Sequence, residues 1–189
     1  MVSKDYETSL SKRMTKILRH DPASYGLTLD PHDGSVPVEE LLHALRRLKG
    51  WQAVTMENLQ QVVAHSDKQR FEITGDRIRA RYGHSIERVT YEAGDPPAVL
   101  YHGTGSGTTA VILKDGIRPM GRQYVHLSEG LQFASLAGKR KGQLAIVAVD
   151  TAKAVREGVI FYFAGNEVWL ADYVPAGCCS IYKPEARRR

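Results

Sequence analysis

Residues 71–80 read FEITGDRIRA, and this stretch marks the point where the chain changes from helical to extended periodicity. Apolar and polar side chains alternate on both sides of a Thr-Gly-Asp turn, which is the pattern of a short hairpin. The residues before it follow the spacing of amphipathic helices. Such segments begin near Ser9, Val38 and Thr55, and the last has Asn58 at the capping-box position. Three helices followed by a two-stranded wing are typical of a winged-helix module.

The chain beyond this hairpin is rich in expected strands. Residues 86–98 contain the turn signal Gly-Asp-Pro-Pro and are expected to form a linker. The strands are expected at 99–101, 124–127, 144–149, 159–163, 168–170 and 179–182, with short helices at 108–114 and 131–139. We therefore predict an α+β protein. A winged-helix-like lobe occupies residues 1–85 and a mixed-β lobe occupies 99–189, and the cleft between the lobes is the expected site.

The composition is that of an ordinary folded protein. The chain has 189 residues, enough for one domain or two small ones, and its 42% hydrophobic and 25% charged residues argue against disorder. No apolar run approaches the roughly 20 residues that span a bilayer, and the first residues do not resemble a signal peptide. We therefore expect a cytoplasmic protein that does not bind a membrane.

The net charge is +5 and the pI is about 9.2, which suggests an anionic partner. Residues 1–85 contain 13 Lys and Arg against 11 Asp and Glu, and residues 86–189 contain 13 against 10. Because neither half concentrates the positive charge, a nucleic acid would have to meet a basic patch that folding creates.

Cysteine and histidine spacing gives no sign of a metal centre. Cys178 and Cys179 are adjacent, so in a strand they would point to opposite faces and would suit neither a structural disulfide nor a metal site. We expect them to act as small apolar residues. The sequence has no CxxC or HExxH motif, so no metal is expected.

Several arginines stand at the ends of expected elements. Arg19 and His20 end the first helix, Arg70 lies where the third helix leads into the hairpin, and Arg118 and Arg122 lie in a later loop. Each alone is explained by a helix dipole or an ordinary polar turn. Together they could converge on a phosphate group, because guanidinium groups bind phosphate oxygens with two N–H donors at once.

A glycine-containing segment, residues 101–108, leaves an expected strand and enters a helix. Glycines allow close approach to a ligand, and a helix N-terminus favours phosphate. The segment fails as a dinucleotide-binding fingerprint because Thr108 occupies the third glycine position and helices and a hairpin precede it. It has no Gly-Lys-Ser/Thr and is not a P-loop. An ordinary turn explains it equally well, and His126 alone would be a core or edge-strand histidine.

These separate signals fall into one order along the chain, and together they resemble the RNA 2′-phosphotransferase family. The matching stretches are Ser11-Lys12 through Leu18-Arg19-His20, Lys68-Gln69-Arg70-Phe71, Gly83-His84-Ser85, Leu100-Tyr101-His102-Gly103-Thr104, Gly116-Ile117 with Met120 and Arg122-Gln123, Val125-His126-Leu127-Ser128, and Val168-Trp169-Leu170 with Val174-Pro175. The resemblance covers nearly the whole chain, and seven motifs in order are more specific than any one.

The resemblance implies an activity, a fold and a set of site residues. The family transfers an internal RNA 2′-phosphate to NAD⁺, as in the last step of tRNA splicing, and its C-terminal lobe is a split β-sheet similar to ADP-ribosyltransferases. Carried over, the catalytic residues are Arg19, His20, Arg70 and Arg122. The NAD⁺-binding residues are His102, Gly103, Thr104, His126, Ser128 and Val168. Further RNA or phosphate contacts fall to Lys12, Lys68, His84 and Ser85. The implied partners are a tRNA-like RNA and NAD⁺ as co-substrate, and we expect a monomer.

The implied chemistry suits a site rich in arginine and poor in carboxylates. In the first step the 2′-phosphate attacks the anomeric carbon of the nicotinamide ribose, and neutral nicotinamide leaves without a general acid. In the second step the 2″-hydroxyl of ADP-ribosylated RNA attacks the phosphodiester and releases ADP-ribose 1″,2″-cyclic phosphate. The site must align the reactants and stabilise charge on phosphoryl oxygens. We expect His20 to orient the phosphate rather than to move a proton.

Two positions depart from the family pattern, and two other functions stay open. Arg81-Tyr82 stands where the family commonly has Asn-Gln, and Glu167 stands beside Val168, close to where ordinary ADP-ribosyltransferases place a catalytic glutamate. One alternative function is a mono-ADP-ribosyltransferase acting on nucleic-acid phosphate ends or on protein. The other is a non-catalytic winged-helix binder of nucleic acid, which would bind without consuming NAD⁺.

Overall fold

A computed structural model of the chain describes residues 3–66, 69–86, 89–138 and 143–183. The chain forms two compact units, Met1–Tyr91 and Glu92–Arg189. Both helices and strands are present in each unit, so the predicted α+β class is confirmed. None of the helices in the described ranges has the length and apolar character needed to cross a bilayer.

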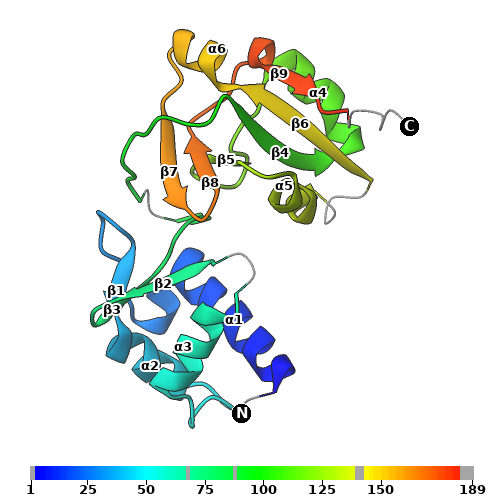
Figure 1. The fold of residues 1–189 in the computed structure, drawn as a ribbon. Helices are drawn as coiled ribbons and strands as arrows, with labels where there is room; N and C mark the ends of the chain where they lie inside the picture. Colours follow the sequence, from blue (N-terminus) through cyan, green and yellow to red (C-terminus); the bar gives the residue numbers. More distant parts are fainter. Residues whose placement is uncertain (1–2, 67–68, 87–88, 139–142, 184–189) are drawn as a thin grey trace. The chain divides into compact units, whose positions relative to one another are not determined.

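The first unit combines three helices with a small sheet (Figure 1). Its elements are α1 (Lys4–Arg19), η1 (Ala23–Tyr25), β1 (Ser35–Pro37), α2 (Val38–Arg46), α3 (Met56–Ala64), β2 (Phe71–Thr74) and β3 (Arg77–Ala80). The strand order is β1-β3-β2, with both pairings antiparallel. The hairpin predicted at residues 71–80 is therefore present, but a third strand that was not predicted completes the sheet.

Local signals explain where these helices begin. The Ser3 hydroxyl accepts a hydrogen bond from Tyr6 N, so α1 begins five residues before the expected Ser9. The expected Thr55 cap of α3 is confirmed, because the Thr55 hydroxyl accepts from Asn58 N. Asn58 stands where a capping box usually has Glu or Gln, and its side chain completes the box by accepting from Thr55 N.

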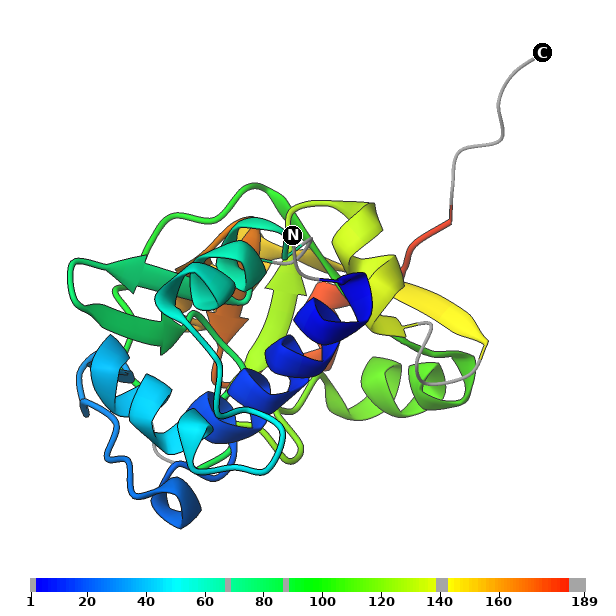
Figure 2. The ribbon, with the colours of Figure 1, turned by 90° about the horizontal axis from the view of Figure 1, so that it is seen from below.

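The core of the first unit lies where the helices cover the sheet. Helix α1 packs against α3 (Figures 1 and 2), and each contributes apolar residues spaced along one face. The largest fully buried side chains of this core are Leu10, Met14, Ile17, Leu18, Leu29, Leu41, Leu42, Leu45, Leu59, Phe71 and Ile78. This burial fixes the end of α1, where Arg19 stands.

The second unit is built around a six-stranded antiparallel sheet with the strand order β7-β8-β5-β4-β6-β9. Its elements are β4 (Val99–Gly105), η2 (Ser106–Thr108), α4 (Thr109–Asp115), β5 (Val125–Ser128), α5 (Leu131–Gly138), β6 (Leu144–Asp150), α6 (Thr151–Arg156), β7 (Phe161–Gly165), β8 (Val168–Ala171), η4 (Ala176–Cys178) and β9 (Cys179–Ile181). All six predicted strands are present, and α6 is an addition.

In the middle of this sheet, two neighbouring strands are paired over only a short stretch. Strands β4 and β5 share a single residue pair, Tyr101 with Ser128, whereas β4 and β6 share seven. The sheet is thus two three-stranded halves, β7-β8-β5 and β4-β6-β9, which Figure 1 shows within this unit. Strand β4 also continues through Gly105, beyond the strand expected at 99–101, so residues 101–105 of the glycine-containing segment are strand.

Parts of the expected linker, residues 86–98, are buried or hydrogen-bonded within one unit or the other. In the first unit Val89 is buried, and the Thr90 hydroxyl donates to His32 O at 3.0 Å. In the second unit Gly94 N donates to Phe161 O at 2.9 Å. The boundary between the units, after Tyr91, falls inside the expected linker of residues 86–98.

The two adjacent cysteines are free thiols. Cys178 is buried and Cys179 is half-buried, in keeping with the apolar role expected for them. Burial, and then the neighbouring Cys178, raises the pKa of Cys179 to about 11. The thiolate is therefore disfavoured, and this pair is poorly suited to nucleophilic chemistry.

Candidate functional site

Arg19 ends α1 with its side chain inside the protein rather than in solvent. It is 8% exposed, and its guanidinium carbon lies 5.0 Å from the centre of the Tyr82 ring and 5.8 Å from that of Phe71. Both distances are within the range of cation–π attraction. The adjacent His20 is exposed. The helix end thus presents a buried guanidinium next to an accessible imidazole.

The segment Tyr82–Ser85 holds this pair in place. Ser85 N donates to Arg19 O at 2.9 Å, and the Ser85 hydroxyl lies 2.8 Å from His20 Nδ1. Gly83 adopts φ +88°, and a Cβ there would lie 3.2 Å from an Arg19 Nη. Glycine is therefore required both by the backbone conformation and by the space that the guanidinium occupies. The predicted residues Arg19, His20 and Ser85 are brought together.

His84 is the buried member of this segment. It is 2% exposed, and neither ring nitrogen has a hydrogen-bond partner among the residues that the structure describes. A Cβ on Gly34 would lie 3.0 Å from its Nε2. Burial, and then the positive charges of Arg19 and His20, lowers the pKa of His84 to about 4. The imidazole is thus neutral and shielded from solvent, and in this structure it is not placed to contact RNA directly.

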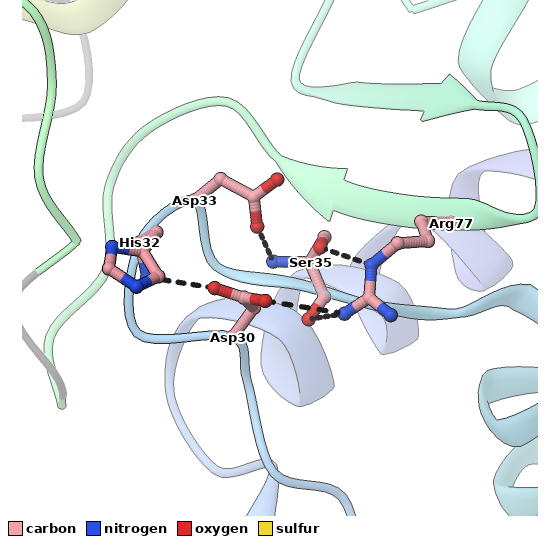
Figure 3. A network of polar contacts seen from close by, with 5 residues as sticks. All are labelled: Asp30, His32, Asp33, Ser35 and Arg77. Carbon is pink, nitrogen blue, oxygen red and sulfur yellow. Dashed lines mark hydrogen bonds and ion pairs between the residues drawn. The ribbon is translucent and has the colours of Figure 1, made fainter.

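A polar network shapes the turn that covers this imidazole (Figure 3). Asp30 Oδ1 accepts from His32 N at 2.9 Å, and Asp33 Oδ1 accepts from Ser35 N at 2.9 Å. Arg77 Nε donates to the Ser35 hydroxyl at 2.7 Å, and Arg77 Nη2 lies 3.9 Å from Asp30 Oδ2. The turn is thereby tied to β3, the central strand of the sheet.

The depressed pKa of His84 predicts a loss of stability in weak acid. A histidine whose folded pKa is about 4 and whose unfolded pKa is 6.5 keeps its full contribution above pH 6.5 and loses it as the pH falls to about 4. The loss amounts to about 3 kcal/mol of unfolding free energy. We expect a His84→Leu variant to lack this dependence. Urea unfolding of the full chain, followed through the Met14 methyl signal at pH 7, 5.5 and 4.5, measures it.

The exposed His43 provides the control, because a His43→Gln change should leave the acid sensitivity of the first unit as it is in the wild type. Parallel pH curves for the wild type and the His84→Leu variant would contradict the assignment.

Arg70 lies at the open end of the β2–β3 hairpin. Arg81 N donates to Arg70 O at 2.9 Å, and Arg70 directly precedes Phe71, whose ring contacts Arg19. Gln69 before it adopts φ +37°, a strained conformation for a residue with a side chain. Lys68 lies outside the described residues. Lys12 is exposed on α1, seven residues before Arg19.

Two histidines face the junction of the sheet halves in the second unit. His102 Nδ1 lies 2.9 Å from His126 O, and His126 Nδ1 lies 3.0 Å from Tyr124 O. A carbonyl oxygen only accepts hydrogen bonds, so Nδ1 carries a proton in both rings. The backbone thus fixes the orientation of both side chains.

Ser128 lies in β5, between the strand that contains His102 and the strand that contains Val168. It pairs with Tyr101 in β4 and with Val168 in β8, and its hydroxyl lies 3.0 Å from Gly130 O. Ser128 and Val168 are both buried. The predicted residues His102, His126, Ser128 and Val168 are therefore gathered on three neighbouring strands of one unit.

Gly103 and Thr104 have a structural task in the same strand. A Cβ on Gly103 would lie 1.7 Å from Ala134 O in α5, closer than any real contact. Thr104 is 1% exposed, and its backbone lies 3.0 Å from the position of a Cβ on Gly138. Glycines on both partners let the backbones of β4 and α5 approach each other. The glycine of this motif is explained first by helix packing.

Arg122 is exposed in the loop between α4 and β5. Its N–H donates to Pro119 O at 3.3 Å, and Met120 in between adopts φ +59°. Arg118, the other arginine singled out in this loop, lies 5.5 Å from the centre of the Tyr173 ring. Three of the predicted catalytic residues therefore belong to the first unit and Arg122 to the second.

Comparison with known proteins assigns the family. A family model described as RNA 2′-phosphotransferase, Tpt1 / KptA family, matches residues 5–173. The chain belongs to this family. Similar proteins named probable RNA 2′-phosphotransferase come from Bacillus thuringiensis subsp. konkukian (44% identity, 97% of this chain and 100% of the relative), Acetivibrio thermocellus (42%, 93% and 97%) and Pyrococcus horikoshii (40%, 90% and 96%).

The family match includes the hairpin at Glu167 and Val168. Asn166 and Glu167 adopt φ +47° and +62°, so Glu167 lies in the turn between β7 and β8, whereas Val168 is the first residue of β8. The Glu167 side chain is exposed, and its carbonyl oxygen accepts from Glu129 N at 3.0 Å. In this family member the start of strand β8 therefore falls between Glu167 and Val168.

The two aromatic contacts of Arg19 were not predicted. Phe71 was noted only as part of a motif and Tyr82 only as a departure from the family pattern. The register of the hairpin could have indicated them, because Phe71 pairs with Ala80 and Tyr82 follows two residues later. Both aromatic residues therefore lie near the same end of the sheet. That α1 ends against them depends on tertiary packing, which the local pattern does not show.

Proposed function

We propose that this protein transfers an internal RNA 2′-phosphate to NAD⁺, giving RNA with a 2′-hydroxyl, nicotinamide and ADP-ribose 1″,2″-cyclic phosphate. The observation that carries the proposal is the placement of Arg19 and His20 together at the end of α1 by the segment Tyr82–Ser85. The family assignment over residues 5–173 makes a 2′-phosphate the natural anion for this pair.

In this proposal the first unit is a winged-helix-like module that binds the RNA phosphate. Its support is the element order α1-β1-α2-α3-β2-β3 with the central strand β3. Arg19 and Arg70 donate charge-assisted hydrogen bonds to phosphate oxygens. Arg122, in the second unit, is proposed as a further catalytic guanidinium. His20, held through its Nδ1 by Ser85, orients the phosphate with its other ring nitrogen.

The second unit is proposed to bind NAD⁺ as an ADP-ribosyltransferase-like lobe. Its support is the pair of three-stranded halves that meet at one residue pair, with His102 and His126 on the two adjoining strands. Half-buried imidazoles that the backbone holds in a fixed orientation suit the binding of a dinucleotide. NAD⁺ supplies the anomeric carbon that the phosphate attacks and nicotinamide as the leaving group. Among the residues described, those proposed to contact NAD⁺ are histidines, a serine and apolar side chains.

The test is an incubation with NAD⁺ and a short RNA that carries one radiolabelled internal 2′-phosphate, with no metal added. We expect the label to move into ADP-ribose cyclic phosphate. The first proposed step bonds the labelled 2′-phosphate to the ribose of NAD⁺, and the second closes the cyclic phosphate and releases the RNA. Omission of NAD⁺ is the control and should leave the label on the RNA.

Two other outcomes would replace the proposal. Label that stays on an ADP-ribosylated RNA would indicate a mono-ADP-ribosyltransferase. RNA binding without any consumption of NAD⁺ would indicate a non-catalytic nucleic-acid binder.

A further inference from the structure

We propose that Tyr82 is a positioning residue that fixes the Arg19 guanidinium for binding of a phosphate group. The inference rests on the proposed function and adds to it a residue that stands where the family commonly has glutamine. Tyr82 contacts Arg19 through its ring, with 5.0 Å between the guanidinium carbon and the ring centre. It therefore acts on the reaction only through Arg19.

The backbone on both sides of Tyr82 fixes where its ring lies. Before it, Arg81 N donates to Arg70 O at 2.9 Å, and Arg81 O accepts from the Tyr91 hydroxyl at 2.9 Å. After it, Gly83 turns the chain with φ +88°. Tyr82 itself is 7% exposed. A ring held by this much surrounding structure provides a rigid surface for the guanidinium.

The side chain of Arg81, next to Tyr82, is bound in a separate contact network. Arg81 Nη2 lies 3.1 Å from Glu72 Oε1, and the other oxygen of the same carboxylate bonds with Arg79. Glu72 thus binds both Arg79 of β3 and Arg81 just beyond it. Of the two neighbours Arg81 and Tyr82, it is therefore Tyr82 whose ring contacts Arg19.

An aromatic ring suits this task better than a polar side chain. Cation–π attraction acts between the charge of the guanidinium and the face of the ring, so it does not pair an N–H donor with an acceptor atom of Tyr82. A glutamine in its place would use an N–H donor for its amide oxygen. A flexible arginine side chain also loses rotamer entropy when it is ordered. Ordering Arg19 before the phosphate arrives removes much of that cost from binding.

The inference predicts that the ring of Tyr82, rather than its hydroxyl, controls phosphate affinity. Binding of adenosine 2′-monophosphate to the full chain, measured by calorimetry, should weaken about tenfold in a Tyr82→Leu variant, the size expected for loss of a partly buried cation–π contact. The Tyr82→Phe variant keeps the ring and should bind within about threefold of the wild type. For RNA turnover we expect the Leu variant to raise KM more than it lowers kcat.

Tyr25 provides a matched control. It is a half-buried tyrosine of the same unit whose ring also contacts a cation, Lys16, at 5.8 Å. A Tyr25→Leu variant should bind adenosine 2′-monophosphate as the wild type does. Thermal unfolding of all variants identifies any that fail to fold.

A spectroscopic readout tests the positioning directly. The Arg19 Nε–H resonance should carry a ring-current shift from Tyr82 that is lost in Tyr82→Leu, where only the contribution of Phe71 remains, and kept in Tyr82→Phe. Equal affinities for wild type and Tyr82→Leu, an equal loss in the Phe variant, or no binding of adenosine 2′-monophosphate by the wild type would each overturn the inference. Failure of the proposed function gives a different pattern: phosphate binding and its dependence on Tyr82 remain, while no cyclic phosphate forms from RNA.

Discussion

Replacement of Arg19 by lysine is expected to lower kcat/KM for cyclic phosphate formation by about a hundredfold or more while the fold is kept. A lysine ammonium is a point charge that cannot give two parallel hydrogen bonds to a phosphate, and it has no planar face to lie against Tyr82 and Phe71. Loss of one well-placed donor to a charged transition state costs 10²–10³-fold in comparable sites, as an order of magnitude.

The measurement is the initial rate of label transfer at several RNA concentrations. Arg13→Lys is the control, since Arg13 lies on the same helix and is not one of the proposed site residues. Its rates should match the wild type. An Arg19→Lys enzyme with rates within about fivefold of the wild type would remove Arg19 from the proposed mechanism.

Alanine in place of Gly103 is expected to destabilise the second unit by about 3 kcal/mol or more. The added Cβ would lie 1.7 Å from Ala134 O and 2.6 Å from its carbonyl carbon, so strand β4 and helix α5 must move apart. The neighbours are backbone atoms and cannot rotate away, which places this change at the severe end of overpacking.

Gly107 offers a matched control in the same glycine-containing segment. It lies in the 3-10 helix after β4, where a Cβ would meet no atom within 4 Å, and it does not adopt a positive φ. Gly107→Ala should therefore change the unfolding free energy little. Unfolding of the second unit is followed through the Leu100 and Val147 methyl signals in urea. A Gly103→Ala chain as stable as Gly107→Ala would show that the helix contact is not tight in solution.

The sequence predicted the elements that have strong local signals. The capping box at Thr55 and Asn58 has an unambiguous hydrogen-bond pattern, and the 71–80 hairpin has period-two alternation around a turn. Strand β1 was missed because three residues, Ser35–Pro37, are too short to show any period. The strand becomes recognisable only when it pairs with β3, which comes much later in the chain.

The candidate site was predicted by residue type and order, not by contact. Arg19 and His20 could be named from the sequence, but their attachment to Ser85 depends on a segment that folds back from the far end of the hairpin. His84 was expected at the RNA, and its burial against Gly34 follows from a turn with no apolar pattern. Such contacts come from tertiary packing, and neither propensity nor periodicity encodes them.

The hydrogen bond between His20 and Ser85 joins residues 65 positions apart. The residues of helix α1 are synthesised first, but the imidazole acquires its partner only after the β2–β3 hairpin and the residues that follow it have been synthesised. Closing so long a loop costs entropy before any contact repays it. The proposed phosphate-binding arrangement is therefore among the last features of the first unit to form, and a nascent chain that stops before Gly83 contains Arg19 and His20 without the segment that holds them in place.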